Sequence, residues 1–204
     1  LTSWLRRKQI VPVEPLVPAV TCPMQAAYLT GKTPAQSGIV GNGWYDRTLA
    51  EVQFWKQSNH LVTGEKLWEK VQRDHPDFTT AKVFWWYNMY STADFSITPR
   101  PIYRADGGKI FDVYTHPADL REAVKADLGE FPFPQFWGPM AGLESTRWIA
   151  RSAMWIEEKH WPNLSLVYLP HLDYDFQRHG PDGAEAKRAM RDLDGLLGEM
   201  IEFY

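Results

Sequence analysis

The sequence predicts an α/β protein in which helices flank a parallel sheet. Short runs rich in β-branched and apolar residues lie near both ends of the chain, at 9–17 and 164–169. Amphipathic helical patterns follow them, which is the alternation expected of an α/β fold. With 204 residues, the chain is also long enough to form one domain with a substantial core.

The N-terminal part predicts helix, strand and helix in that order. Residues 1–9 have helical composition, and the proline-broken segment QIVPVEPLV favours a short strand at 11–13. A second helix is expected over 22–30, because a proline falls in its first turn and a glycine follows its last. The stretch 31–59, rich in Gly, Asn, Ser and Thr, predicts loop with little regular structure.

The middle of the chain, 48–143, predicts an irregular lobe rich in aromatic residues. We expect this lobe to be an insert or cap that is continuous with a core formed by 1–47 and 144–204. Its expected elements are a helix in GEKLWEKVQRDHP, a strand in TTAKVFWWY, a hairpin at the Gly-Gly pair of RADGGKI, and a helix over 117–128. The C-terminal part predicts helices over 144–160 and 182–203, with a strand over 164–169 between them.

Composition and charge exclude some classes of partner. The formal net charge is -3 and no basic block occurs, so we expect no binding to a nucleic-acid polymer. No apolar run approaches the roughly 20 residues that cross a bilayer, so no membrane partner is expected. The single cysteine fits a reducing, cytoplasmic compartment. Because the chain begins within a helical pattern, LTSWLRRKQ, its natural start is expected to lie further upstream.

The first candidate site residue is Thr21, in the stretch TCPMQAAYLTGKTPAQSGIVGN. It lies where the predicted first strand meets the predicted second helix. A hydroxyl there has two interpretations: it caps the helix, or it faces an anion or metal at the helix N-terminus. Position alone favours the cap.

The second candidate site is the segment LVYLPHLDYDFQRHGPD, where a predicted strand runs into a predicted loop. The loop carries five polar side chains: His171, Asp173, Asp175, Gln177 and His179. Ligands of open α/β sheets bind at the carboxyl ends of strands, and both candidate sites fall at such ends. Carboxylate and imidazole together suit zinc or a similar divalent ion. A solvated loop with no ligand is the alternative.

Together the two stretches resemble the alkaline phosphatase superfamily, specifically its nucleotide pyrophosphatase/phosphodiesterase-like branch. The matching positions, in the branch's order and spacing, are Thr21, Pro23, Thr30-Gly31, Pro34, Gly38-Ile39 and Asn42, followed by Asp173 and Gly180-Pro181. The resemblance implies a nucleophilic threonine, an asparagine that donates to a phosphoryl oxygen, and two divalent metal ions, with zinc favoured over manganese. It also implies a small phosphorylated substrate.

The chain departs from the branch's pattern in two ways. Gln177 stands where the pattern has a histidine, so Gln177 and His179 remain alternatives for that metal ligand, beside Asp173 and Thr21. A register that uses Asp175 and His179 keeps the four-residue spacing but loses the Gly-Pro match. The branch's remaining metal ligands have no counterpart here, which predicts that the chain is part of a longer enzyme.

These observations leave two function classes open. One is a metal-dependent phosphodiesterase or nucleotide pyrophosphatase, with a phosphomonoesterase or phosphonate hydrolase as a close variant. The other is a non-catalytic α/β binding module that has lost metal binding. In the aromatic segment WWYNMY, Asn88 and Tyr90 are the polar residues predicted to contact substrate, and the segment itself is either core or a stacking platform for a flat group.

Overall fold

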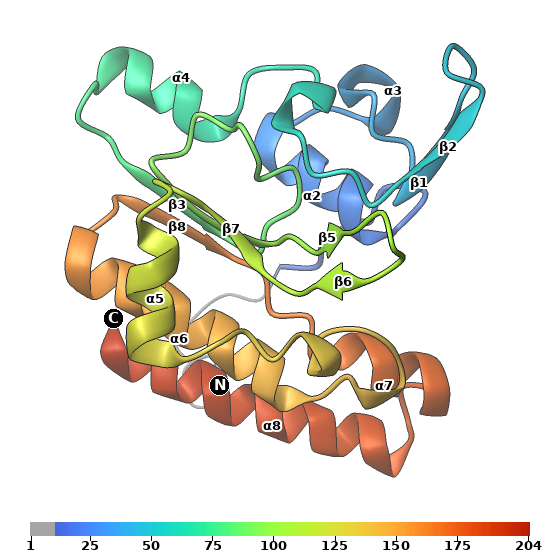
Figure 1. The fold of residues 1–204 in the computed structure, drawn as a ribbon, viewed down its shortest axis with the longest axis vertical. Helices are drawn as coiled ribbons and strands as arrows, with labels where there is room; N and C mark the ends of the chain where they lie inside the picture. Colours follow the sequence, from blue (N-terminus) through green and yellow to red (C-terminus); the bar gives the residue numbers. More distant parts are fainter. Residues whose placement is uncertain (1–10) are drawn as a thin grey trace.

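The computed structural model describes residues 11–204, and its centre is a four-stranded mixed sheet (Figure 1). The strand order is β7 (Val113–His116), β4 (Phe95–Pro99), β3 (Thr80–Val83) and β8 (Leu164–Val167). β3 pairs in parallel with both β4 and β8, whereas β7 runs antiparallel to β4. The α/β class with a sheet flanked by helices is therefore confirmed.

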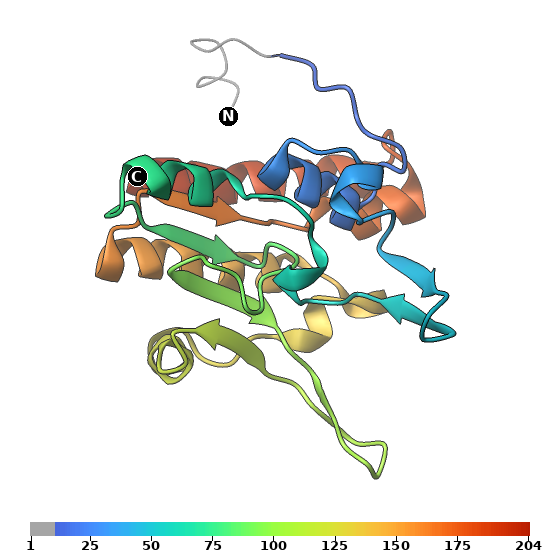
Figure 2. The ribbon, with the colours of Figure 1, turned by 90° about the horizontal axis from the view of Figure 1, so that it is seen from above.

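Helices cover both faces of this sheet (Figures 1 and 2). One face packs against α5 (Leu120–Leu128) and α6 (Leu143–His160), and α8 (Ala184–Phe203) packs beside α6. The other face carries α2 (Thr21–Thr30) and α4 (Leu67–Asp74), whose Leu29 and Trp68 pack with the β8 leucines.

Successive side chains of a strand point to opposite faces of the sheet, and in β3 the side chains on both faces are buried. In β3, Ala81 and Val83 belong to the core beneath α6, while Thr80 and Lys82 face the α4 side and are also fully buried. Parallel strands covered on both faces have this near-continuous burial. The range 48–143, expected to be an insert, supplies three of the four strands, so the sheet is built jointly by this range and by β8.

The remaining elements lie at the periphery. They are α3 (Pro34–Ser37), the hairpin of β1 (Gly43–Asp46) and β2 (Glu51–Phe54), the 3-10 turns η1 (Asn59–Leu61), η2 (Phe133–Gln135) and η3 (Gly138–Met140), the hairpin of β5 (Ile102–Tyr103) and β6 (Lys109–Ile110), and α7 (Leu172–His179). The hairpin predicted at the Gly-Gly pair is confirmed, as are the helices expected over 22–30 and 144–160. The helix expected over 1–9 lies outside the described residues.

Three local predictions are wrong. No strand forms at 11–13, because prolines remove amide donors there and Val11, Val13 and Val17 remain exposed. The segment 31–59 is not all loop, since it forms α3 and the β1–β2 hairpin. The polar loop expected after β8 is mostly helix α7, with two aspartates in its favourable N-terminal turn.

Lys82 is a fully buried lysine on β3, and it predicts a pH-dependent stability. Its Nζ donates to the Tyr87 carbonyl (3.0 Å) and lies 5.1 Å from the centre of the Trp68 ring. The pKa of Lys82 is lowered from 10.5 to about 7, mainly by burial. The charge of Lys66 contributes to this lowering, and the charge of Glu69 opposes it. Above pH 7 the unfolded chain therefore holds a proton that the folded chain releases.

We expect the free energy of unfolding to rise between pH 7 and 8.5, with a slope of at most about 1.4 kcal/mol per pH unit from this group. Chemical denaturation at several pH values measures it. In Lys82→Met that rise should disappear, while in Lys159→Met, an exposed control on α6, it should persist. An equally steep rise in Lys82→Met would show that another group is responsible. The window ends at 8.5 because burial raises the pKa of the Cys22 thiol to about 12, which opposes the trend at higher pH.

Candidate active site

Thr21 is the first residue of α2, one position inside the helix rather than at its cap. The cap position belongs to Val20, whose backbone is extended (φ -121°, ψ 164°) and whose carbonyl accepts the Met24 N–H (3.2 Å). Val20 has no polar side-chain atom to cap the helix. The half-buried Thr21 residue therefore lies in the first turn of α2, at the positive end of the helix dipole, where negative charge is favoured.

Asn42 supplies the missing cap from twenty residues away. Its Oδ1 accepts the backbone N–H of Cys22 at 2.9 Å. Its own carbonyl accepts the Trp55 N–H at 3.0 Å, which anchors it to the end of the β1–β2 hairpin. Because Oδ1 is engaged by the helix, the Asn42 Nδ2 group is the part able to donate to a ligand. At the next residue, Gly43, an added Cβ would lie 2.5 Å from Cδ2 of Phe54, so a side chain there would require the Phe54 ring to move.

Tyr168, which follows β8, connects Thr21 with α7. The pKa of Tyr168 is raised to about 12, mainly by burial. The charge of Asp173 contributes to this rise, whereas a hydrogen bond with the Thr21 side chain opposes it. Hydrogen bonds thus connect the start of α2 with Asn42 and with Tyr168, which come from separate segments of the chain. Tyr168 was missed by the sequence analysis, and its only signal was its position directly after a strand.

The two candidate registers on α7 have different neighbours. Asp173 and Gln177 share one side of the helix, and the Gln177 Nε2 donates to Asp173 Oδ1 at 3.1 Å. His179 is exposed, and its Nδ1 lies 3.9 Å from Glu185 Oε2 of α8. Of the first pair, Asp173 acts by its charge on Tyr168, which is the hydrogen-bond partner of Thr21. Which residue binds a metal stays a prediction.

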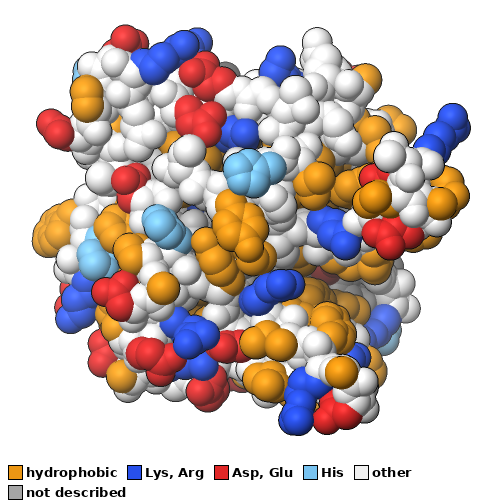
Figure 3. Space-filling view, turned by 45° about the horizontal axis from the view of Figure 1, so that its top comes forward, with side chains coloured by type: hydrophobic (Ala, Val, Ile, Leu, Met, Phe, Trp, Pro, Cys, Tyr) orange, Lys and Arg blue, Asp and Glu red, His pale blue; other side chains and the backbone are white. Residues whose placement is uncertain are grey.

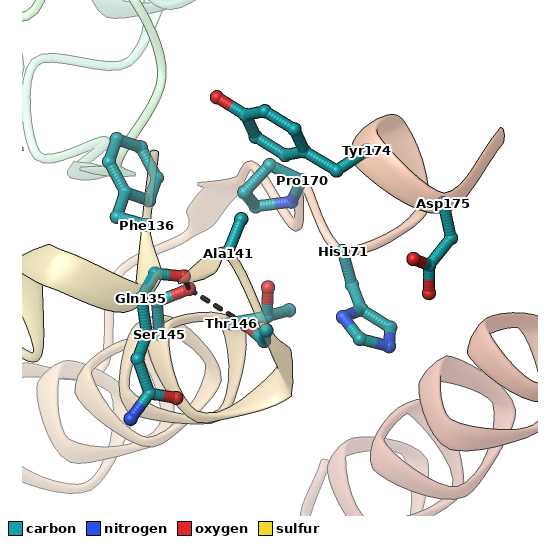
Figure 4. Close-up of a pocket in the computed structure, with 10 residues that line it drawn as sticks. Gln135, Phe136, Ala141, Ser145, Thr146, Pro170, His171, Tyr174 and Asp175 are labelled. Atoms are coloured by element: carbon teal, nitrogen blue, oxygen red, sulfur yellow. Dashed lines mark hydrogen bonds between the residues drawn. The ribbon is translucent and has the colours of Figure 1, made fainter. Parts of the chain in front are cut away.

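Asp175 lies beside His171 instead, around a small cavity of about 50 Å³ between α6 and α7 (Figure 4). Figure 4 shows Thr146 of α6 and His171 turned toward one another there, and each has a buried polar atom with no hydrogen-bond partner in the described structure. Burial lowers the pKa of His171, while Asp192 and Asp175 act to raise it. A cavity of this size accommodates water rather than a substrate.

The described residues do not by themselves form a complete metal site. Within 11–204, no group of three or more His, Cys, Asp or Glu side chains is close enough to hold an ion. The candidate donors Thr21, Asp173 and Gln177 offer a hydroxyl, a carboxylate and an amide, which are oxygen ligands that suit manganese or magnesium. His179 would add the imidazole that zinc prefers. These residues fit part of a divalent-cation site.

The two predicted substrate residues lie in different environments. Asn88 is fully buried, and its Nδ2 donates to the carbonyls of Lys82 (2.9 Å) and Ile97 (3.0 Å). It therefore connects β3 with β4, and this geometry does not support the predicted substrate contact. Tyr90 is 61% exposed and has positive φ (60°). It lines an open cleft of about 780 Å³.

This aromatic cleft is the largest cavity found near the candidate site. It is lined by Phe54, Trp55, Lys56, Gln57, Ser58, Trp86, Met89, Tyr90, Pro99, Arg100, Pro101, Tyr103, Trp137 and Tyr174. Trp86 packs against Cys22 of α2, and Tyr174 follows Asp173, so the cleft borders the residues described above. On the face drawn in Figure 3, hydrophobic side chains gather with lysine and arginine between them. Such a surface suits a flat apolar group attached to an anion.

Comparison with known proteins places this site in a family context. Residues 1–204 match the type I phosphodiesterase / nucleotide pyrophosphatase family. The chain is 26% identical over 209 residues to an uncharacterized pyrophosphatase/phosphodiesterase of Schizosaccharomyces pombe, covering 99% of this chain and 36% of that protein. These matches confirm the resemblance identified from the sequence motifs.

Solved structures share the fold at low sequence identity. A phosphonoacetate hydrolase from Sinorhizobium meliloti 1021, in complex with phosphonoacetate, is 13% identical with a TM-score of 0.56, over 93% of this chain and 44% of that chain. The murine ectonucleotide pyrophosphatase / phosphodiesterase 5, an inactive form in complex with AMP, is 15% identical with a TM-score of 0.51, over 90% and 40%. The chain thus spans less than half the length of these relatives. Among residues 11–204, none of the helices combines the length and apolarity needed to cross a bilayer.

Proposed function

The chain belongs to the type I phosphodiesterase / nucleotide pyrophosphatase family, and we propose that the intact protein is a metal-dependent phosphoryl hydrolase with Thr21 as its nucleophile. The observation that carries this proposal is the cap that Asn42 provides at Cys22, because it brings an amide donor beside the hydroxyl at a helix N-terminus. Tyr168 supports it as well, because its hydroxyl is hydrogen-bonded to the Thr21 side chain and its pKa responds to the charge of Asp173.

Each residue has a chemical role in the proposed reaction. The Thr21 oxygen attacks phosphorus, its proton leaves to solvent, and the opposite P–O bond breaks in line; water then hydrolyses the Thr21 ester. The Asn42 Nδ2 donates to a non-bridging phosphoryl oxygen, where negative charge builds up, and the N-terminus of α2 favours that charge. A bound divalent cation lowers the pKa of the attacking hydroxyl and neutralises phosphoryl charge.

Metal binding is proposed to involve two divalent ions, zinc or manganese, with this chain supplying part of the ligands. Asp173 and Gln177 would hold one ion, with His179 as the alternative to Gln177, and Thr21 would coordinate a metal ion through its hydroxyl. The family is generally metal-dependent, which supports this assignment. The aromatic cleft, including Tyr90, would bind a flat group on the substrate. A phosphodiester or pyrophosphate can carry such a group, so we favour these substrates over a small phosphonate such as the phosphonoacetate bound by the Sinorhizobium hydrolase.

Metal removal tests the enzymatic class. Dialysis of the intact protein against a chelator should abolish hydrolysis of a chromogenic phosphodiester, and added zinc or manganese should restore it, because the hydroxyl is a poor nucleophile without activation. A parallel assay on a phosphomonoester and a phosphonate distinguishes the substrate variants. Unchanged hydrolysis after complete metal removal would contradict the metal-dependent mechanism. Metal binding without turnover of any of the three substrates would favour a binding module.

A further inference from the structure

Trp137 belongs to the segment 136–142, which contains the turn η3 and is called here the Trp137 loop. Trp137 is 37% exposed and lines the cleft. One side of its ring packs against the core, with ring centres 5.2 Å from Phe133 and 4.9 Å from Phe136. Any movement of this loop therefore changes the shape of the cleft.

Two side chains of α7 hold the Trp137 loop by its backbone at Gly138. The Gly138 N–H donates to the Tyr174 hydroxyl at 2.8 Å, and the Arg178 Nη2 donates to the Gly138 carbonyl at 2.9 Å. The Arg178 guanidinium also lies 5.2 Å from the centre of the Tyr174 ring. Figure 4 shows the Tyr174 side chain extending from α7 toward the segment that carries Phe136. The N–H and the carbonyl of Gly138 are thus both hydrogen-bonded to side chains of α7.

Residue spacing and backbone conformation explain this clamp. Tyr174 and Arg178 are four residues apart, so they project from the same side of α7. Gly138 has φ of +81°, which a residue with a side chain rarely adopts, and this turns its N–H and carbonyl toward α7. By contrast, the Ala141 and Gly142 N–H groups bond to the neighbouring Gly138 and Gln135 carbonyls.

The clamp connects two parts of the candidate site. α7 also carries Asp173 and Gln177, while the Trp137 loop faces the cleft. A hydrogen bond to a charged donor contributes more than a neutral one, so Arg178 is expected to be the stronger half of the clamp. Tyr174 itself lines the cleft beside Trp137.

We propose that Tyr174 and Arg178 are positioning residues that set substrate selectivity, because they fix the Trp137 wall of the cleft to the helix of the candidate metal site. This inference rests on the proposed function in one respect: the cleft must receive the flat group of a phosphorylated substrate. The holding of the loop by α7 does not depend on it.

The test combines hydrogen exchange with binding of two probes. Tyr174→Phe, Arg178→Met and the double variant remove the clamp, and Arg188→Met, an exposed arginine of α8, is the control. Exchange is followed by mass spectrometry on peptides covering 136–142. Binding of AMP and of ribose 5-phosphate, which lacks the base, is measured by calorimetry with manganese present. The intact protein is used throughout.

In the double variant we expect exchange within 136–142 to accelerate about tenfold or more, since at least two hydrogen bonds are lost. The Kd for AMP should rise several-fold while that for ribose 5-phosphate stays unchanged, and the control should match the parent in all measurements. Unchanged exchange would overturn the clamp. Faster exchange with an unchanged AMP Kd, or an equal loss for both probes, would overturn its role in selectivity. A parent protein that binds the two probes equally would overturn the cleft assignment but leave the proposed hydrolase intact, whereas binding of neither would count against both.

Discussion

Replacing Thr21 by alanine is expected to abolish turnover in the intact enzyme while leaving it folded. The substitution removes the attacking oxygen, and loss of an activated nucleophile typically costs several orders of magnitude in rate. Bound metal should be largely retained, because Thr21 is only one of the proposed ligands. Steady-state kinetics on a chromogenic phosphodiester, with the metal content of the same preparation, measures both effects.

Thr21→Ser is the matched control, since it keeps the hydroxyl and should retain measurable activity. A helix-capping role makes a different prediction for alanine, namely a loss of about 1 kcal/mol of stability and little else. The structure argues against the capping role, because Thr21 lies inside α2 and the Cys22 N–H is capped by Asn42. An alanine variant that hydrolyses phosphodiesters at the parent rate would remove Thr21 from the mechanism.

Asn42→Ala is expected to lower kcat by roughly 100- to 1,000-fold, the usual effect of losing one donor to a developing oxyanion. It should also cost about 1 kcal/mol of stability, because Cys22 loses its cap. Asn42→Asp separates the two roles. Aspartate keeps an oxygen that accepts the Cys22 N–H, but it cannot donate when ionised and it repels the phosphoryl group.

The aspartate variant should therefore unfold at about the parent temperature yet remain as inactive as the alanine variant. Thermal unfolding and kcat measured on the same samples give both quantities. Recovery of activity in Asn42→Asp would mean that Asn42 acts by holding the start of α2 rather than by donating to substrate.

Most helices and the protein family could be predicted from the sequence. The helix over 22–30 was bounded by its proline and glycine, and that over 144–160 by its apolar periodicity. The motif spacing from Thr21 to Asn42 identified a family that the comparisons confirm. These sequence patterns are local, because each extends over a few residues or along one chain segment. They therefore do not depend on how distant segments pack.

The failures share one physical cause, which is dependence on distant partners. A strand exists only when another strand accepts its hydrogen bonds, and 11–13 has none in the described structure, whereas 80–83 is paired on both sides. α7 was expected to be loop because its residues are polar; the helix instead presents them on different sides, with Tyr174 and Arg178 holding Gly138.

The sequence by itself determined the α/β class, the helix boundaries marked by proline and glycine, and the chemical types available for a phosphoryl site. Only the tertiary structure decided which of those residues adjoin. Asn42 accepts a hydrogen bond from the start of α2, twenty residues earlier in the chain. Asn88 and Tyr90 are only two positions apart, but Asn88 is buried and hydrogen-bonded between β3 and β4, whereas Tyr90 lines an open cleft. Burial and long-range hydrogen bonding determine the environment of each of these side chains. Both depend on which distant segments the folded chain brings into contact.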